Sequence, residues 1–163
     1  MLDYVMGGGI VTSMNFFTPE KFESIKQDLK TLNWEPTHQP LKMEYGNSFQ
    51  GMPCYQTVYD KENDYIIKGI EEVIKNPIKD FNMIARKILI SEIKASTQDF
   101  SKYGFVHRDY PNDSPQEPLI AGMMYFDQSY AGGTAFFHNQ MEKAPDQYVS
   151  AFPNRLVLYH GGR

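Results

Sequence analysis

Two side chains able to bind a metal ion stand two positions apart in the stretch GFVHRDYPND, namely His107 and Asp109. In an extended strand, residues i and i+2 project from the same side, so the imidazole and the carboxylate can reach one ion together. A third ligand, usually a histidine, completes the facial arrangement of many non-haem Fe(II) sites and leaves the other positions open. Because H-x-D pairs also arise by chance, this pair alone also fits an ordinary exposed turn.

The elements that must position these residues begin with helices. Thr18 suits an N-cap and is followed by Pro19 at the first helical position, and the apolar residues that follow are spaced by 3, 4 and 3. This pattern predicts a helix over Pro19–Leu32. A broad apolar face predicts a second helix over Tyr65–Lys75, which Asn76-Pro77 ends.

Short strands are predicted elsewhere. Loose alternation predicts a first strand over Ile10–Phe17, and Pro- and Gly-rich residues 34–60 favour loops and short irregular strands. Ile-rich alternation predicts a strand over Arg86–Lys94, and apolar or aromatic runs predict further strands at 118–126, 132–139 and 154–160. Several short strands behind a helical layer indicate a β-sandwich or barrel.

Composition narrows the class of protein. The 163 residues predict one domain, 1–163, and the net charge of −4 without a Lys/Arg cluster argues against nucleic acid as a partner. Cys54 is the only cysteine and reads as a small buried side chain rather than a nucleophile. With no signal peptide and no apolar run of about 20 residues, we expect a cytoplasmic protein without a membrane partner.

The motifs that follow His107 come in a specific order. The H-x-D pair is followed by a strand ending in Tyr125-Phe126-Asp127, by a Gly132-Gly133-Thr134 turn before an aromatic strand, and by Asn154-Arg155-Leu156-Val157. Over about residues 84–163 this order resembles the Fe(II)/2-oxoglutarate-dependent dioxygenase superfamily, in particular its prolyl-hydroxylase-like branch. The resemblance implies an α+β fold around a double-stranded β-helix (jelly-roll, cupin-like), with N-terminal helices packed on one sheet.

The resemblance also implies an activity and a site. The protein would be a hydroxylase that uses Fe(II) and 2-oxoglutarate on a small-molecule or peptide substrate. His107 and Asp109 would hold the iron, and Tyr125 would hydrogen-bond the distal carboxylate of 2-oxoglutarate. Arg155 is as compatible with a surface ion pair as with a functional role.

The third metal ligand is less readily found. In the family, the distal histidine and the arginine that binds the carboxylate follow the Asn-Arg-aliphatic strand, so both are expected past Arg163 and the chain is expected to be truncated. Within the chain, His160 is the first candidate ligand, ahead of His138 and His38. The guanidinium of Arg163 could pair with the carboxylate, although a terminal position anchors it poorly.

Other functions stay open at this point. A non-catalytic double-stranded β-helix module, with a binding or structural role, would keep the fold without a complete metal site. A cupin-like metal-dependent isomerase shares the barrel, but Tyr125 and the Gly-Gly-Thr turn argue against it. The aromatic residues between Asn33 and Asp64 could bind an apolar or peptide substrate or simply pack.

Overall fold

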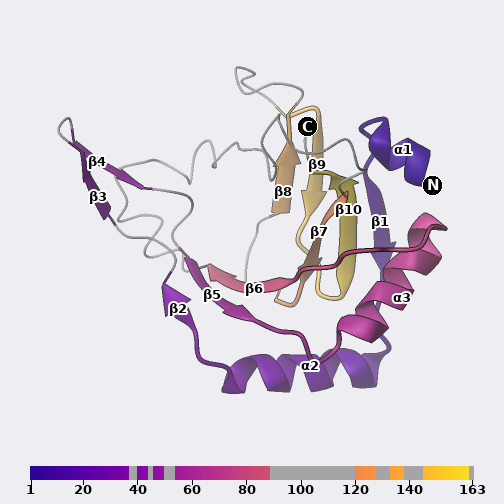
Figure 1. Ribbon diagram of the computed structural model, residues 1–163, viewed down its shortest axis with the longest axis horizontal. Helices are drawn as coiled ribbons and strands as arrows, with labels where there is room; N and C mark the ends of the chain where they lie inside the picture. The colour runs from indigo at the N-terminus through magenta and orange to yellow at the C-terminus, as the bar shows by residue number, and fades with distance from the viewer. Residues whose placement is uncertain are drawn as a thin grey trace. The chain divides into compact units, whose positions relative to one another are not determined.

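The computed structural model describes residues 1–36, 40–43, 46–49, 54–88, 120–127, 133–137 and 145–161. It is a mixed α/β structure whose sheets are antiparallel, and the described strands do not close into a barrel (Figure 1). The elements in chain order are α1 (Leu2–Met6), β1 (Val11–Met14), α2 (Pro19–Thr31), β2 (Glu35–Pro36), β3 (Pro40–Met43), β4 (Gly46–Phe49), β5 (Cys54–Val58), α3 (Asn63–Ile74), β6 (Ile84–Ile88), β7 (Ile120–Tyr125), β8 (Gly133–Phe136), β9 (Gln147–Ser150) and β10 (Arg155–His160).

Both predicted helices are confirmed to within two residues at each end. The Thr18 hydroxyl accepts a hydrogen bond from the Lys21 amide at 3.3 Å, which is the N-cap contact that the sequence predicts for α2. In α3 the buried side chains are Ile66, Ile70 and Ile74, at the four-residue spacing of one helical face. Local capping and periodicity therefore suffice to place these two elements.

The predicted strands are confirmed with shorter bounds, and some elements were missed. The strand expected over Arg86–Lys94 is β6, which begins earlier, at Ile84, while residues 89–94 lie outside the described part. The five-residue helix α1 and the strand β9 were not predicted. Both are too short to carry a periodic signal, so only their tertiary partners can reveal them.

The chain divides into two compact units. The first comprises residues 1–27, 64–79 and 107–163, and the second comprises residues 28–63 and 80–106. The first unit contains a sheet of order β1-β10-β7 and the hairpin β8-β9, and the second contains a sheet of order β2-β5-β6 and the hairpin β3-β4. Among the described helices, none is long and apolar enough to cross a membrane.

The sheet β1-β10-β7 has two distinct faces, because neighbouring residues along a strand point to opposite sides. The odd-numbered residues of β7 and β10 face the hairpin, since the Tyr159 ring meets that of Phe136 in β8 at 5.0 Å between centroids. On the even-numbered side, Phe126 follows β7 and stacks on Phe22 of α2 at 5.3 Å. The sheet is therefore covered by the hairpin on one face and by helical residues on the other.

The side chain of Asn154 joins the start of β10 to the loop between β1 and α2 through two hydrogen bonds. Its side-chain oxygen accepts a hydrogen bond from the Phe17 amide, and its side-chain nitrogen donates to the Phe17 carbonyl, both at 2.8 Å. Asn154 is buried and has a φ of 60°, in the left-handed region that asparagine tolerates better than most residues. These two hydrogen bonds hold the backbone of Phe17 in place, and its fully buried ring packs against Phe22 and Tyr65.

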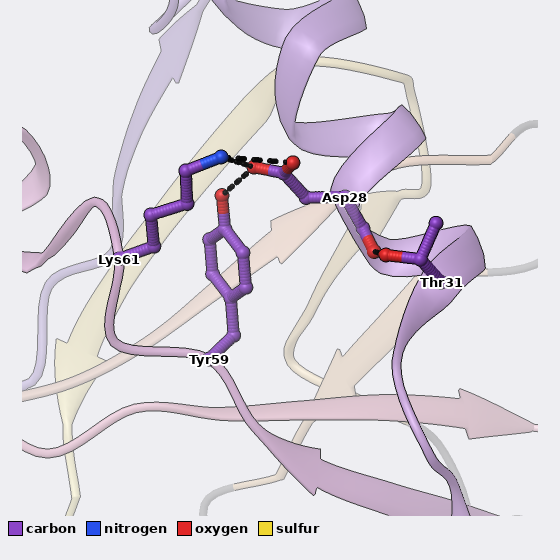
Figure 2. Close-up of polar contacts among 4 residues, drawn as sticks. All are labelled: Asp28, Thr31, Tyr59 and Lys61. Atoms are coloured by element: carbon purple, nitrogen blue, oxygen red, sulfur yellow. Dashed lines mark hydrogen bonds and ion pairs between the residues drawn. The ribbon is translucent and has the colours of Figure 1, made fainter.

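In the second unit, a polar cluster links the end of α2 to the segment after β5 (Figure 2). The Tyr59 hydroxyl donates to an Asp28 carboxylate oxygen at 3.0 Å, and the Lys61 ammonium lies 2.8 Å from the same oxygen. The Thr31 hydroxyl donates to the Asp28 carbonyl at 2.8 Å and satisfies an acceptor in the last turn of the helix. The cluster joins two segments that lie far apart in the sequence.

Candidate functional site

Tyr125, predicted to bind a cosubstrate carboxylate, is the last residue of β7 and lies on the face that the β8-β9 hairpin covers. Its hydroxyl and that of Thr134 in β8 are 2.6 Å apart. The Thr134 hydroxyl also lies in donor geometry 3.3 Å from the Met123 sulfur. A threonine hydroxyl has one proton, so while that proton points to Met123, the Tyr125 hydroxyl is the donor to Thr134.

The phenol of Tyr125 keeps its proton at neutral pH. Burial raises its pKa above the ordinary value and Tyr148 adds to the rise, while the hydrogen bond with Thr134 and the charge of Arg155 oppose it. A neutral phenol can donate one hydrogen bond and accept others. Tyr125 can therefore donate to an anion once its proton turns away from Thr134.

Arg155 is the residue directly opposite Tyr125 in the ladder between β10 and β7. Its Nη1 donates to the Ser150 carbonyl at 2.7 Å and lies 3.1 Å from the Ser150 hydroxyl. The guanidinium carbon stands 4.6 Å from the centroid of the Phe152 ring. Among the described residues, no carboxylate forms an ion pair with Arg155, so the surface ion pair considered from sequence is not found there.

The hairpin brings its own polar groups to the same end of the sheet. Thr134 pairs with Val149, and the next pair along the ladder is Gly133 with Ser150, so the partners of Tyr125 and Arg155 occupy adjacent positions. A Cβ at Gly133 would overlap the Val149 carbonyl oxygen and would stand 2.8 Å from the Ser150 Cα. Gly133 is thus needed for the close approach of the two strands.

His160, the candidate third metal ligand, lies far from Tyr125 in the same sheet. It is the last residue of β10 and pairs with Ile120, the first residue of β7, whereas Tyr125 is the last. Five residues of strand separate the two ends by about 17 Å, and the alternation of side chains puts His160 and Tyr125 on opposite faces. One small site therefore cannot use both residues, and His160 as the third metal ligand stays a prediction.

The remaining predicted ligands lie outside the described residues. This holds for His107 and Asp109, for the lower-ranked candidates His138 and His38, and for Arg163. In the part of the chain that the structure describes, no group of three or more His, Cys, Asp or Glu side chains is placed to hold a metal ion. The H-x-D pair therefore stays a prediction from the sequence.

The Asp28, Tyr59 and Lys61 cluster combines residue types that can do proton chemistry. Burial of Tyr59, the hydrogen bond to Asp28 and the nearby negative charges all raise its pKa. A tyrosine that acts as a base near neutral pH needs a lowered pKa. We therefore interpret the cluster as structural. Tyr59 is one of the aromatic residues between Asn33 and Asp64 that could have bound a substrate. Its side chain is buried, so it packs in the interior instead.

A hollow of about 370 Å³ lies on the second unit beside the pair formed by Val58 and Ile84. Both side chains are exposed, at 69% and 43%. The described residues of the lining include one ionisable group and neither histidine nor cysteine; they are Asn33, Glu35, Gln56, Thr57, Val58 and Ile84. It can accommodate a small molecule but supplies no acid–base pair, so Tyr125 and Arg155 remain the better candidates.

Sequence reasoning missed three residues of this region. Asn154 was noted only as part of a motif, although an asparagine after proline in a turn is a known signal for a left-handed backbone. Thr134 was likewise noted only as part of the Gly-Gly-Thr turn, and Ser150 had no local signal. The contacts of both depend on the packing of the hairpin against the sheet. Comparison of the chain with protein-family models, with curated proteins and with solved structures found no match.

Proposed function

We propose that the protein is a non-haem Fe(II)- and 2-oxoglutarate-dependent oxygenase, a hydroxylase of a small-molecule or peptide substrate. The observation that supports the proposal is that the Tyr125 phenol lies between a sheet and a facing hairpin, and that Tyr125 follows the H-x-D pair in the sequence. The bound iron would supply the chemistry with O₂.

The strand pairing is compatible with the fold that this function needs. A double-stranded β-helix consists of two facing antiparallel sheets that enclose a site between them. Here β10 pairs with β7, β8 pairs with β9, and the hairpin faces one side of the sheet through the contacts of Thr134 and Phe136. We propose that these strands are part of such a double-stranded β-helix.

Each residue has a distinct role in the proposal. His107 and Asp109 have the donor set that Fe(II) accepts, one neutral imidazole and one carboxylate. Tyr125 donates a hydrogen bond to the cosubstrate and orients it. His160 is not included, because it lies on the other face of the sheet from Tyr125.

The test uses anaerobic protein with Fe(II) and 2-oxoglutarate, both titrated to high concentration. We expect the visible charge-transfer band that a 2-oxo acid gives when it chelates Fe(II). His107→Ala should abolish the band, whereas His160→Ala, a matched removal of one imidazole, should leave it unchanged.

Three results would contradict the proposal or a part of it. A folded wild-type protein without the band refutes the oxygenase and favours the non-catalytic β-module that the sequence left open. A band of undiminished strength in His107→Ala refutes the metal assignment. Loss of the band in His160→Ala alone would show that the metal lies on the helical side of the sheet, away from Tyr125.

A further inference from the structure

The hollow on the second unit lies where the chain before β2 separates from β5. The pairing of these strands begins at Glu35, opposite Gln56, whereas β5 continues for two more residues, to Val58. Just before β2, the Trp34 indole nitrogen donates to the Leu29 carbonyl at 3.2 Å, which holds the chain against the last turn of α2. A space of about 370 Å³ therefore remains beside the end of β5.

Most of the lining lies on one face of the sheet β2-β5-β6. Gln56 and Val58 are two positions apart on β5, so their side chains point to the same side. Glu35 lies opposite Gln56, and Ile84 lies opposite Val58, so these two side chains share that side. The face thus has a polar half at Glu35 and Gln56 and an aliphatic half at Val58 and Ile84, both of which are exposed.

The charge of the hollow is negative. Of the described lining residues only Glu35 carries a formal charge, and no ion pair within the described part of the chain involves its exposed carboxylate. The amides of Asn33 and Gln56 and the Thr57 hydroxyl can all accept hydrogen bonds. Arg86 is on the same face but two strands away from Glu35, about 10 Å across the sheet. This lining favours a positively charged donor and disfavours an anion.

The distance between the two halves sets the length of a ligand that can use both. Diagonal neighbours across an antiparallel pair, such as Glu35 and Val58, are about 7–8 Å apart. A chain of about four or five carbons covers most of that distance, since a C–C bond is about 1.5 Å long. The volume of the hollow is within the range of small-molecule sites, about 300–1,000 Å³.

We infer that this hollow is a binding site for a small aliphatic amine, a primary ammonium on an unbranched stem of about four or five carbons. Glu35 pairs with the ammonium group, and the stem lies against Val58 and Ile84, which removes apolar surface from water. The inference does not depend on the proposed function, because none of these residues takes part in that proposal.

The experiment measures binding of pentylamine, pentanol and pentanoate to the metal-free wild-type protein at neutral pH by ligand-observed NMR. The three probes share a five-carbon chain and differ in the charge of the end group. We expect the affinity to fall in the order pentylamine, pentanol, pentanoate. Methylamine should bind at least about tenfold more weakly than pentylamine, since each fully buried methylene contributes about fourfold.

Four variants test whether binding takes place in the hollow. Glu35→Gln removes the charge and keeps the shape, so pentylamine affinity should fall about two- to fivefold, the effect of an exposed ion pair, with pentanol unchanged. Glu35→Lys should reverse the preference and favour pentanoate. Val58→Thr should weaken pentylamine and pentanol alike. Glu72→Gln removes an exposed carboxylate from α3, outside the described lining, and should change no affinity. Urea unfolding of each variant shows whether the fold is intact.

Several outcomes overturn the inference. These are equal affinities for pentanol and pentylamine, a Glu35→Gln variant that behaves like Glu72→Gln, and a Glu35→Lys variant that still prefers the amine. A fourth probe, Nα-acetyllysine amide, carries the same ammonium on a stem attached to peptide groups. If it binds more tightly than pentylamine, the site takes a lysine side chain of a partner protein and the free amine is refuted. None of these results depends on the charge-transfer band with Fe(II) and 2-oxoglutarate.

Discussion

Replacing Asn154 with alanine removes the two hydrogen bonds that join the start of β10 to the loop before α2. Two buried backbone groups of Phe17, its amide and its carbonyl, would lose their partners. Each such loss costs about 1–3 kcal/mol, and an alanine held at a φ of 60° adds about 1–2 kcal/mol. We expect Asn154→Ala to lower the free energy of unfolding by about 3–8 kcal/mol, a large share of the typical total of about 5–15 kcal/mol.

The assay is urea unfolding followed by circular dichroism, with two variants that separate the causes. Asn154→Gly removes the same hydrogen bonds without backbone strain, so it should be less destabilised than Asn154→Ala. Asn15→Ala is the matched control, because Asn15 has a φ of 53° but is exposed. If Asn154→Ala costs no more than Asn15→Ala, the hydrogen bonds to Phe17 do not contribute as argued.

A third variant, Asn154→Asp, adds a pH dependence. One carboxylate oxygen can still accept from the Phe17 amide, but the other would face the Phe17 carbonyl, where Nδ2 now donates. Burial and this repulsion raise the pKa of the introduced carboxyl in the folded state above its unfolded value. The variant should therefore be most stable at acid pH, where the protonated group can donate, and should lose stability relative to wild type as the pH rises past about 4.

Three further changes have defined outcomes in the same unfolding assay. Tyr59→Phe should cost about 1 kcal/mol near neutral pH, because it removes the hydrogen bond to Asp28. Burial raises the folded-state pKa of Tyr59, so wild-type stability should fall as the pH rises above about 10, and the variant should lose less there. Lys75→Gly should stabilise by about 1 kcal/mol, since Lys75 follows α3 with a φ of 59°. Gly133→Ala should cost about 1–3 kcal/mol, because its methyl group would overlap the Val149 carbonyl.

The helices were predictable because their signals are local. The cap at Thr18 and the spacing of Ile66, Ile70 and Ile74 lie within a few residues of what they determine. The hydrogen bonds of Asn154 are made to Phe17, which lies 137 residues earlier in the chain. A local sequence pattern cannot indicate a contact between residues so far apart. The pairing of β10 with both β1 and β7 likewise joins the two ends of the sequence, and only the folded chain reveals it.

The candidate site was half predictable for the same reason. Tyr125 was chosen because a motif order surrounds it, whereas Arg155 had two equally good interpretations in the sequence. What the sequence could not give is the register of β10 on β7, which sets Arg155 opposite Tyr125 on the face that the hairpin covers. A slip of one residue would move Arg155 to the helical face and bring Leu156 in its place. The hydrogen bonds of Asn154, which fix where β10 begins, therefore also determine which side chain stands beside the phenol.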